Sequence, residues 1–376
     1  MTRKERLQRT LRGDPVDRPP VNFYELNGYH QDPEDMDEFN IFNDPSWQPL
    51  LTLVKNKSDR IILHGLHFIE PENEREHTVS TINARGSLLT VIELDTPKGK
   101  LTRRTRRDRN INTVWETEHL LKTKDDILAY LSIPETDDMG KFDPSGILKC
   151  DEAIGDEGLA AFDIGDALCS VAPLFSMEDF TVFAMTEQNL FTELLNRAQK
   201  KIINRLRIIS EAFPGRLYRI CGSEYASVPY LPPLLHRKYV VDYEQTQVDI
   251  IHKYNGYARI HSHGNLSDII DGIISMGVDA LDPVEPPPQG DVFLRDIRER
   301  YGKQIVIFGN IEVSEIENLD ADAFRDRVKR LLEDGMSGTG RGFVLMPTSC
   351  SYGRKLSDKA FRNYEIMVEL TEDAFY

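Results

Sequence analysis

The chain is poor in cysteine, in positive charge and in long apolar runs. Only four of its 376 residues are cysteines, and their wide dispersal excludes a disulfide framework. The 62 acidic residues exceed the 46 basic ones and give a formal net charge of -16, which argues against binding the phosphates of nucleic acid. No window approaches the apolar length of a membrane span, and the charged segment 1–7 lacks the apolar core of a signal peptide. We therefore expect a cytoplasmic protein with no nucleic-acid partner and no membrane partner.

Strand-like and helix-like segments alternate along most of the chain. The fingerprint G-x-G-x-x-G does not follow any of the strand-like runs, which argues against a dinucleotide-binding fold. Repeated strand-helix units require a parallel sheet, and their number favours a closed (β/α)8 TIM barrel of the α/β class over an open sheet. We expect one domain over residues 1–376 with an N-terminal extension. The predicted strands cover residues 21–24, 60–64, 159–163, 217–222, 259–261, 280–285, 304–308 and 343–346.

A different pattern occupies residues 77 to 121. Residues 78–82, 87–94 and 113–117 alternate apolar and polar side chains with period two, with glycine and proline turns between them. This pattern predicts an antiparallel β insert in the barrel. The arginine-rich run 103–109 lies inside it, and we interpret its cations as a solvated strand face.

Two histidines stand one residue apart where a strand should end. Because alternate residues of a strand point to the same side, His261 and His263 can face one point together, as two ligands of a metal ion do. Cys350 ends a later strand-like run and could supply a soft third ligand. The same residues also fit a pair of hydrogen-bonded histidines and an ordinary buried thiol.

Polar side chains collect at the predicted carboxyl ends of the strands, where TIM barrels carry their chemistry. Asp282 and Glu285 flank a proline, so they fit either substrate positioning or a rigid turn. Tyr24 and Glu25 could bind a substrate or simply close the barrel. The full set is Tyr24, Glu25, Asp163, Glu224, His261, His263, Asp282, Glu285, Asn310, Glu312 and Cys350.

The chain resembles the uroporphyrinogen decarboxylase superfamily, and within it the branch of corrinoid- or cobalamin-dependent methyltransferases. The resemblance runs through nearly the whole chain and implies a TIM barrel. Its marks are the opening 4–21, His261-Ser-His-Gly264, Gly277 to Glu285, Phe308-Gly-Asn-Ile311 and the last strand ending near Cys350.

Two departures from the family pattern point to the methyltransferase branch and to its metal. The decarboxylases carry arginines just after the opening motif, whereas residues 21–30 here contain none, so decarboxylation of an anionic tetrapyrrole is disfavoured. The methyltransferases bind zinc through His-x-Cys-Gly and a later cysteine, and this chain has His263 in place of the first cysteine. The resemblance therefore implies Zn²⁺ held by His261, His263 and Cys350, with Glu224 or Glu285 completing or replacing the set.

The resemblance implies a zinc-dependent methyltransferase. It would move a methyl group between a small methylated substrate, such as a methyl ether, and a corrinoid protein or a thiol acceptor, with Glu224, Glu285 and Tyr24 as catalytic candidates. Two alternatives stay open: a decarboxylase like the family's founding member, and a catalytically silent barrel that serves as a binding subunit. The sequence leaves open the methyl donor, the direction of transfer and whether the barrel forms a homodimer.

Overall fold

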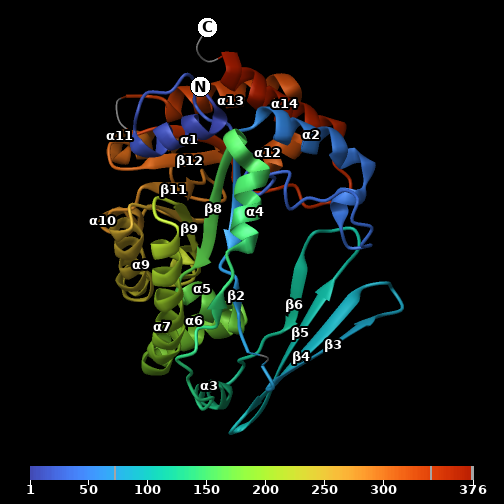
Figure 1. Ribbon diagram of the computed structural model, residues 1–376, viewed down its shortest axis with the longest axis vertical. Coiled ribbons are helices and arrows are strands. Elements are labelled where there is room, and N and C mark those ends of the chain that lie inside the picture. Colours follow the sequence, from blue (N-terminus) through green and yellow to red (C-terminus); the bar gives the residue numbers. More distant parts are fainter. Residues whose placement is uncertain (72, 339–340, 374–376) are drawn as a thin grey trace.

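A computed structural model describes residues 1–71, 73–338 and 341–373. Its main body is a curled sheet of seven parallel strands in the spatial order β1-β8-β9-β10-β11-β12-β13 (Figure 1). This is a TIM-barrel-like α/β fold, and these seven strands lie within a few residues of seven of the eight predicted ones. The strands are β1 (Arg60–Gly65), β8 (Gly158–Gly165), β9 (Leu217–Cys221), β10 (Tyr257–Ser262), β11 (Ala280–Pro283), β12 (Val306–Ile311) and β13 (Phe343–Pro347).

Helices connect successive strands, as parallel pairing requires. The longest is α7, which packs on α5 and α9. Between α8 and α9 the chain makes one π-helical turn, Arg237–Val241. The α-helices are α1 (Arg3–Arg12), α2 (Gln48–Lys57), α3 (Lys124–Leu131), α4 (Ser145–Ile154), α5 (Ala167–Val171), α6 (Met177–Thr186), α7 (Gln188–Ala212), α8 (Pro233–His236), α9 (Asp242–Lys253), α10 (Ile270–Ser275), α11 (Leu294–Tyr301), α12 (Val313–Asn318), α13 (Ala321–Gly335) and α14 (Asp358–Asp373).

The strand predicted at residues 21–24 does not form, so a closed eight-stranded barrel is not what the structure shows. Val21 makes a single parallel bridge to Leu345 of β13, and its carbonyl accepts a hydrogen bond from the amide of Asp59, just before β1. The segment therefore contacts both edge strands without pairing as a strand. Pro19 and Pro20 supply no backbone donors, and Tyr24 has a φ of 55°, which takes the chain out of the extended region.

A four-stranded antiparallel sheet stands beside the main body, where the alternating pattern predicted an antiparallel insert (Figure 1). Its arginine-rich strand is β5, and those arginines are matched by acids: Arg103 pairs with Glu116, and Arg104 pairs with Glu118 at 2.7 Å. Acids therefore neutralise most, though not all, of the predicted solvated cationic face. The strands are β3 (Glu76–Ile82), β4 (Leu88–Thr96), β5 (Gly99–Arg107) and β6 (Val114–Glu118), and a separate pair is formed by β2 (Phe68–Ile69) and β7 (Lys141–Phe142).

Helix α1 lies at the end of the main sheet where its strands begin (Figure 1). Thr2 caps it by accepting from the Glu5 amide, and Gly13 ends it in the left-handed region with φ 78°. Leu7 and Leu11 are buried in a core cluster with side chains of the strands. The opposite, carboxyl end of the sheet is therefore the end left for the polar side chains.

No single helix of the described ranges is apolar and long enough to cross a membrane. One bent pair, Ala167–Leu174 with Met177–Thr186, meets the length and composition criteria together, with an angle of 116° between its members.

Asp59 ties α1 to the main sheet, so we expect Asp59→Ala to destabilise the fold strongly. The Asp59 side chain is fully buried and bonds Arg6 at 2.6 Å, Arg18 at 2.8 Å and the Val21 amide at 2.9 Å. Its loss leaves buried guanidinium groups undercompensated, at a cost of about 3 kcal/mol in the free energy of unfolding. In urea denaturation the control Asp14→Ala, which removes an exposed pair with Arg12, should cost less than about 1 kcal/mol. Equal effects of the two substitutions would contradict this role.

Candidate functional site at the carboxyl ends of the strands

His261 and His263 lie side by side at the carboxyl end of β10. Their ring centroids are 4.6 Å apart and their planes are nearly perpendicular. Each Nδ1 is 2.8 Å from a carboxylate oxygen, that of Asp282 for His261 and that of Glu285 for His263. Because a carboxylate only accepts hydrogen bonds, both Nδ1 atoms carry the proton. In the neutral form of each ring, Nε2 then keeps a lone pair.

Asp282 anchors this arrangement from inside the sheet. It is completely buried and accepts two bonds from Arg259, at 2.5 and 2.8 Å, in addition to the one from His261. Burial opposes its ionisation, but the charges of Arg259 and His261 keep its pKa well below the ordinary value. The buried carboxylate is thus fully ionised and holds the His261 ring in one orientation.

Glu285 and Glu312 lie close to one another but titrate differently. Glu285 accepts from His263 and from the Gly264 amide at 2.7 Å, and these bonds outweigh burial and lower its pKa. Glu312 Oε2 accepts a 3.2 Å bond from Thr348, while its Oε1 is buried without a partner among the described residues. Burial and the charge of Glu285 raise the pKa of Glu312 to about 7. Two carboxyl groups with separated pKa values suit base and acid roles in one site.

Tyr24 joins the histidines to a second ion-pair group. Its hydroxyl is 3.3 Å from His261 Nε2, and the guanidinium carbon of Arg219 lies 5.5 Å from the centre of its ring. Arg219 donates to both oxygens of Asp163, at 2.7 and 2.8 Å, and to Glu25 at 2.9 Å. Tyr24, a predicted catalytic residue, is therefore placed between the His261 ring and a buried arginine. Burial raises the pKa of its hydroxyl far above the ordinary value, so the hydroxyl is a proton donor to its neighbours.

Cys350 follows β13 and lies against the backbone of Glu25 and Leu26. Burial raises the pKa of its thiol to about 12, so the neutral thiol is the stable form in this environment. In the described part of the chain, no three His, Cys, Asp or Glu side chains are already arranged around one point as a metal site. The structure therefore brings the two predicted histidines together, while the predicted third ligand stays against the neighbouring loop.

Even so, the histidine pair has the feature that supports metal ligation elsewhere in proteins. A histidine ligand usually donates its other ring N–H to a carboxylate or carbonyl, which fixes the ring and raises its basicity. His261 and His263 both do so. His263 is the accessible member, because its side chain is 35 % exposed against 7 % for His261. The donor set fits zinc at two positions.

Glu224 follows β9 and lies near His263 and near two buried acids, Asp166 and Glu244. Its Oε2 is buried without a hydrogen-bond partner among the described residues, and its charge acts on His263, Asp166 and Glu244. Glu224, predicted as catalytic, thus lies near enough to His263 and to the buried acids for its charge to act on both.

Asp166 and Glu244 form a carboxyl pair that sequence reasoning missed. Both are 0 % exposed. Asp166 Oδ1 accepts from the Cys169 amide at 2.5 Å, whereas its Oδ2 and both oxygens of Glu244 have no donor in the described ranges. Burial raises the pKa of Asp166 to about 8 and that of Glu244 well above its ordinary value. The pair therefore stays protonated near neutral pH instead of carrying two buried negative charges.

Two buried arginines were missed as well, although a signal for them existed. Arg219 and Arg259 occupy paired positions on β9 and β10. Alternation puts Arg259 on the same side as His261, and Arg219 on the same side as Cys221. An arginine on a strand's inner face demands carboxylates opposite it, and Asp163 and Asp282 supply them. Glu244 had no comparable signal, because helix α9 is polar on other faces too.

Comparisons with known proteins identify a similar fold but no family. No protein-family model matches the chain, and no curated protein matches it either. Among solved structures, a methyltransferase from Methanosarcina mazei is similar over 100 % of both chains, with a TM-score of 0.60 and 17 % sequence identity. D-psicose 3-epimerase in the presence of D-fructose is similar over 62 % of this chain and 84 % of its own, with a TM-score of 0.37 and 10 % identity. At these identities the likeness to the methyltransferase shows a shared fold, and the epimerase is too distant to carry an argument.

We expect Glu244→Gln to make the stability of the protein less dependent on pH. The pKa of Glu244 is raised in the folded state, so the folded protein binds more protons than the unfolded chain above about pH 4.5, and its stability falls as pH rises. Glutamine cannot ionise and can still donate to Asp166. The slope of the unfolding free energy between pH 5 and 8 should become shallower, by up to about 1.4 kcal/mol per pH unit.

Urea denaturation at several pH values measures this slope, with the exposed Glu333→Gln as the matched control. A slope identical in Glu244→Gln and the native protein would show that Glu244 carries no proton there.

Proposed function

We propose that the protein is a methyltransferase that works at the carboxyl ends of its strands. It would move a methyl group between a small methylated substrate, such as a methyl ether, and a corrinoid protein or a thiol acceptor. The observation that carries the proposal is the pair His261 and His263, each oriented by a carboxylate. The full-length likeness of the fold to a methyltransferase supports it.

We propose Zn²⁺ as the resident metal, held by Nε2 of His261, Nε2 of His263 and the sulfur of Cys350. When bound, such an ion polarises an oxygen or sulfur atom of the substrate. The Tyr24 hydroxyl now bonds His261 Nε2, so it has to turn away when that nitrogen takes a ligand. The released hydroxyl is then free to donate to the substrate oxygen beside it.

The chain's own carboxyl groups divide the remaining work. Glu285 uses both oxygens to hold His263 and the Gly264 amide, so its part is to position the accessible histidine. Glu224 keeps a buried oxygen free and is the group that accepts or returns a proton near His263. We propose that a separate protein carries the corrinoid. The residues at the carboxyl ends of the strands would then align the methyl group for in-line transfer.

Metal analysis tests the ligand set. We expect the purified protein to contain zinc in near-equimolar amount, and His261→Ala, His263→Ala and Cys350→Ala each to lower that amount sharply. Glu285→Gln should weaken zinc binding by about 10- to 100-fold, because it removes the negative charge beside His263 and one of the two acceptor oxygens that hold His263 and the Gly264 amide. His252 is an exposed histidine bonded to Asp279, and the control substitution His252→Ala should leave the zinc content unchanged. Zinc retained in full by all three alanine variants would remove these ligands from the proposal.

A transfer assay tests the activity. The protein is incubated with a reduced corrinoid protein and a panel of methyl ethers, methylamines and methanol, and methylcobalamin is followed in the optical spectrum. We expect methylcobalamin to form with one donor class and Glu224→Gln to slow its formation by about 10²-fold or more. A zinc-free protein that produces no methylcobalamin with any donor would instead support the silent barrel.

A further inference from the structure

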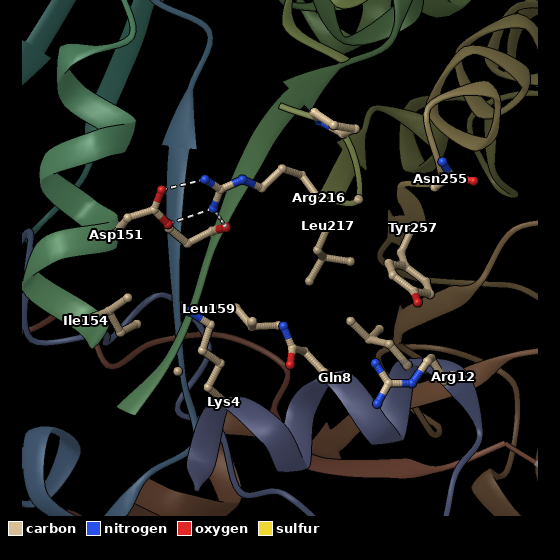
Figure 2. Close-up of a pocket in the computed structure, with 15 residues that line it drawn as sticks. Lys4, Gln8, Arg12, Asp151, Ile154, Leu159, Arg216, Leu217, Asn255 and Tyr257 are labelled. Carbon is tan, nitrogen blue, oxygen red and sulfur yellow. Dashed lines mark hydrogen bonds and ion pairs between the residues drawn. The ribbon is translucent and has the colours of Figure 1, made fainter. Parts of the chain in front are cut away.

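A cavity lies at the opposite end of the sheet from the histidines. It has a volume of about 470 Å³ and is bounded by α1, α4 and the amino ends of β8, β9 and β10 (Figure 2). Small-molecule sites typically measure about 300–1,000 Å³. Its position separates it from the proposed methyltransferase site, so an inference about it does not depend on that function.

One face of α1 supplies the polar wall of this cavity. Lys4, Gln8 and Arg12 are spaced four residues apart, which places them along one side of the helix. Figure 2 shows these side chains directed toward the strands, with Leu217 and Tyr257 opposite them. The apolar residues Leu7 and Leu11 of the same helix are buried, so packing of the helix fixes which side chains reach the cavity.

The groups that remain available in the cavity are mostly hydrogen-bond donors. Asp151 is its one acidic lining residue, and Arg216 already occupies both of its oxygens, one of them at 2.6 Å (Figure 2). Lys4 forms no ion pair with any described residue. The Gln8 side chain makes no hydrogen bond within the described ranges, and the Tyr257 hydroxyl lies near Arg12.

Charge and polarity of the lining therefore define the kind of ligand. Lys4, Arg12 and Arg216 against Asp151 leave an excess of two positive charges around the cavity, and the pair of Arg12 with Asp14 reduces that excess to one. This reverses the sign of a protein whose net charge is -16 and locally attracts anions. Ile154 and Leu217 are buried and form the apolar part of the cavity wall.

We propose that this cavity binds a small organic anion, with the carboxylate, sulfonate or phosphate group against Lys4 and Arg12 and an apolar body on Leu217 and Ile154. Gln8 and Tyr257 donate to the remaining oxygens of the anionic group. The bound anion bridges α1 to the strands and so strengthens the contact between them.

Fluorescence titration of the full-length protein with 8-anilinonaphthalene-1-sulfonate, an aromatic body with a sulfonate, tests the proposal. We expect saturable binding that weakens with salt. Lys4→Gln/Arg12→Gln should weaken it at least tenfold, whereas Lys98→Gln/Lys141→Gln, which removes two exposed lysines in or beside the β insert, should change it less than twofold. The uncharged analogue N-phenyl-1-naphthylamine should bind native protein and Lys4→Gln/Arg12→Gln equally.

Gln8→Trp keeps the charges but fills the cavity, and it should also weaken binding of the sulfonate at least tenfold. If circular dichroism shows that Lys4→Gln/Arg12→Gln loosens α1, the affinity of Gln8→Trp is the test of the proposed site. Affinity within twofold of native in Gln8→Trp would overturn the proposal, and so would an unchanged affinity in a correctly folded Lys4→Gln/Arg12→Gln protein.

Discussion

The candidate site depends on one buried carboxylate, that of Asp282. A carboxylate without access to water is stable only when cations and donors surround it, and here Arg259 and His261 do so from the neighbouring strand β10. The parallel pairing of β10 and β11 places His261 directly opposite Asp282. His261 is thereby fixed in tautomer and in orientation, and alternation along the same strand then brings His263 beside it and within reach of Glu285. The buried charge of Asp282 therefore orients His261 directly, and the strand geometry then places His263.

Burial sets the protonation states of the acids around this pair. Glu285 is ionised because His263 and a backbone amide bond to it. The pKa of Glu312 is raised to about 7 because the group is buried and lies near the charge of Glu285. Farther inside, Asp166 and Glu244 have no cation paired with them among the described residues and keep a proton instead. Acids of the same two residue types thus act as anion, as weak acid and as neutral carboxyl group within one end of one sheet, and their neighbours alone make the difference.

The two ends of the sheet have opposite electrostatic character. Carboxylates dominate the end where the strands finish, whereas the charged side chains that line the cavity beneath α1 are mostly cations. The division follows from the fold, because all strands run in one direction and every strand-to-helix loop therefore opens at the same end. Helix α1 covers the other end with its apolar side and presents Lys4, Gln8 and Arg12 along the edge of that contact. The shared fold with a methyltransferase is compatible with chemistry at the acidic end and says nothing about ligands at the other.

Sequence patterns alone determined the seven strands of the main sheet, several of its helices, the antiparallel insert and the adjacency of His261 and His263, because these follow from local periodicity. They failed at residues 21–24, where the prolines and the backbone conformation of Tyr24 prevent a regular strand. The segment contacts both edge strands of the sheet without pairing, and only the tertiary structure shows these contacts. Only tertiary structure decided the partners: that Asp282 and Glu285 orient the histidines, that Arg219 lies between Tyr24 and Asp163, and that Glu244 meets Asp166. Those contacts join residues that are from 21 to 195 positions apart in the chain, and the pairing of charges across such distances depends on burial, which no local pattern encodes.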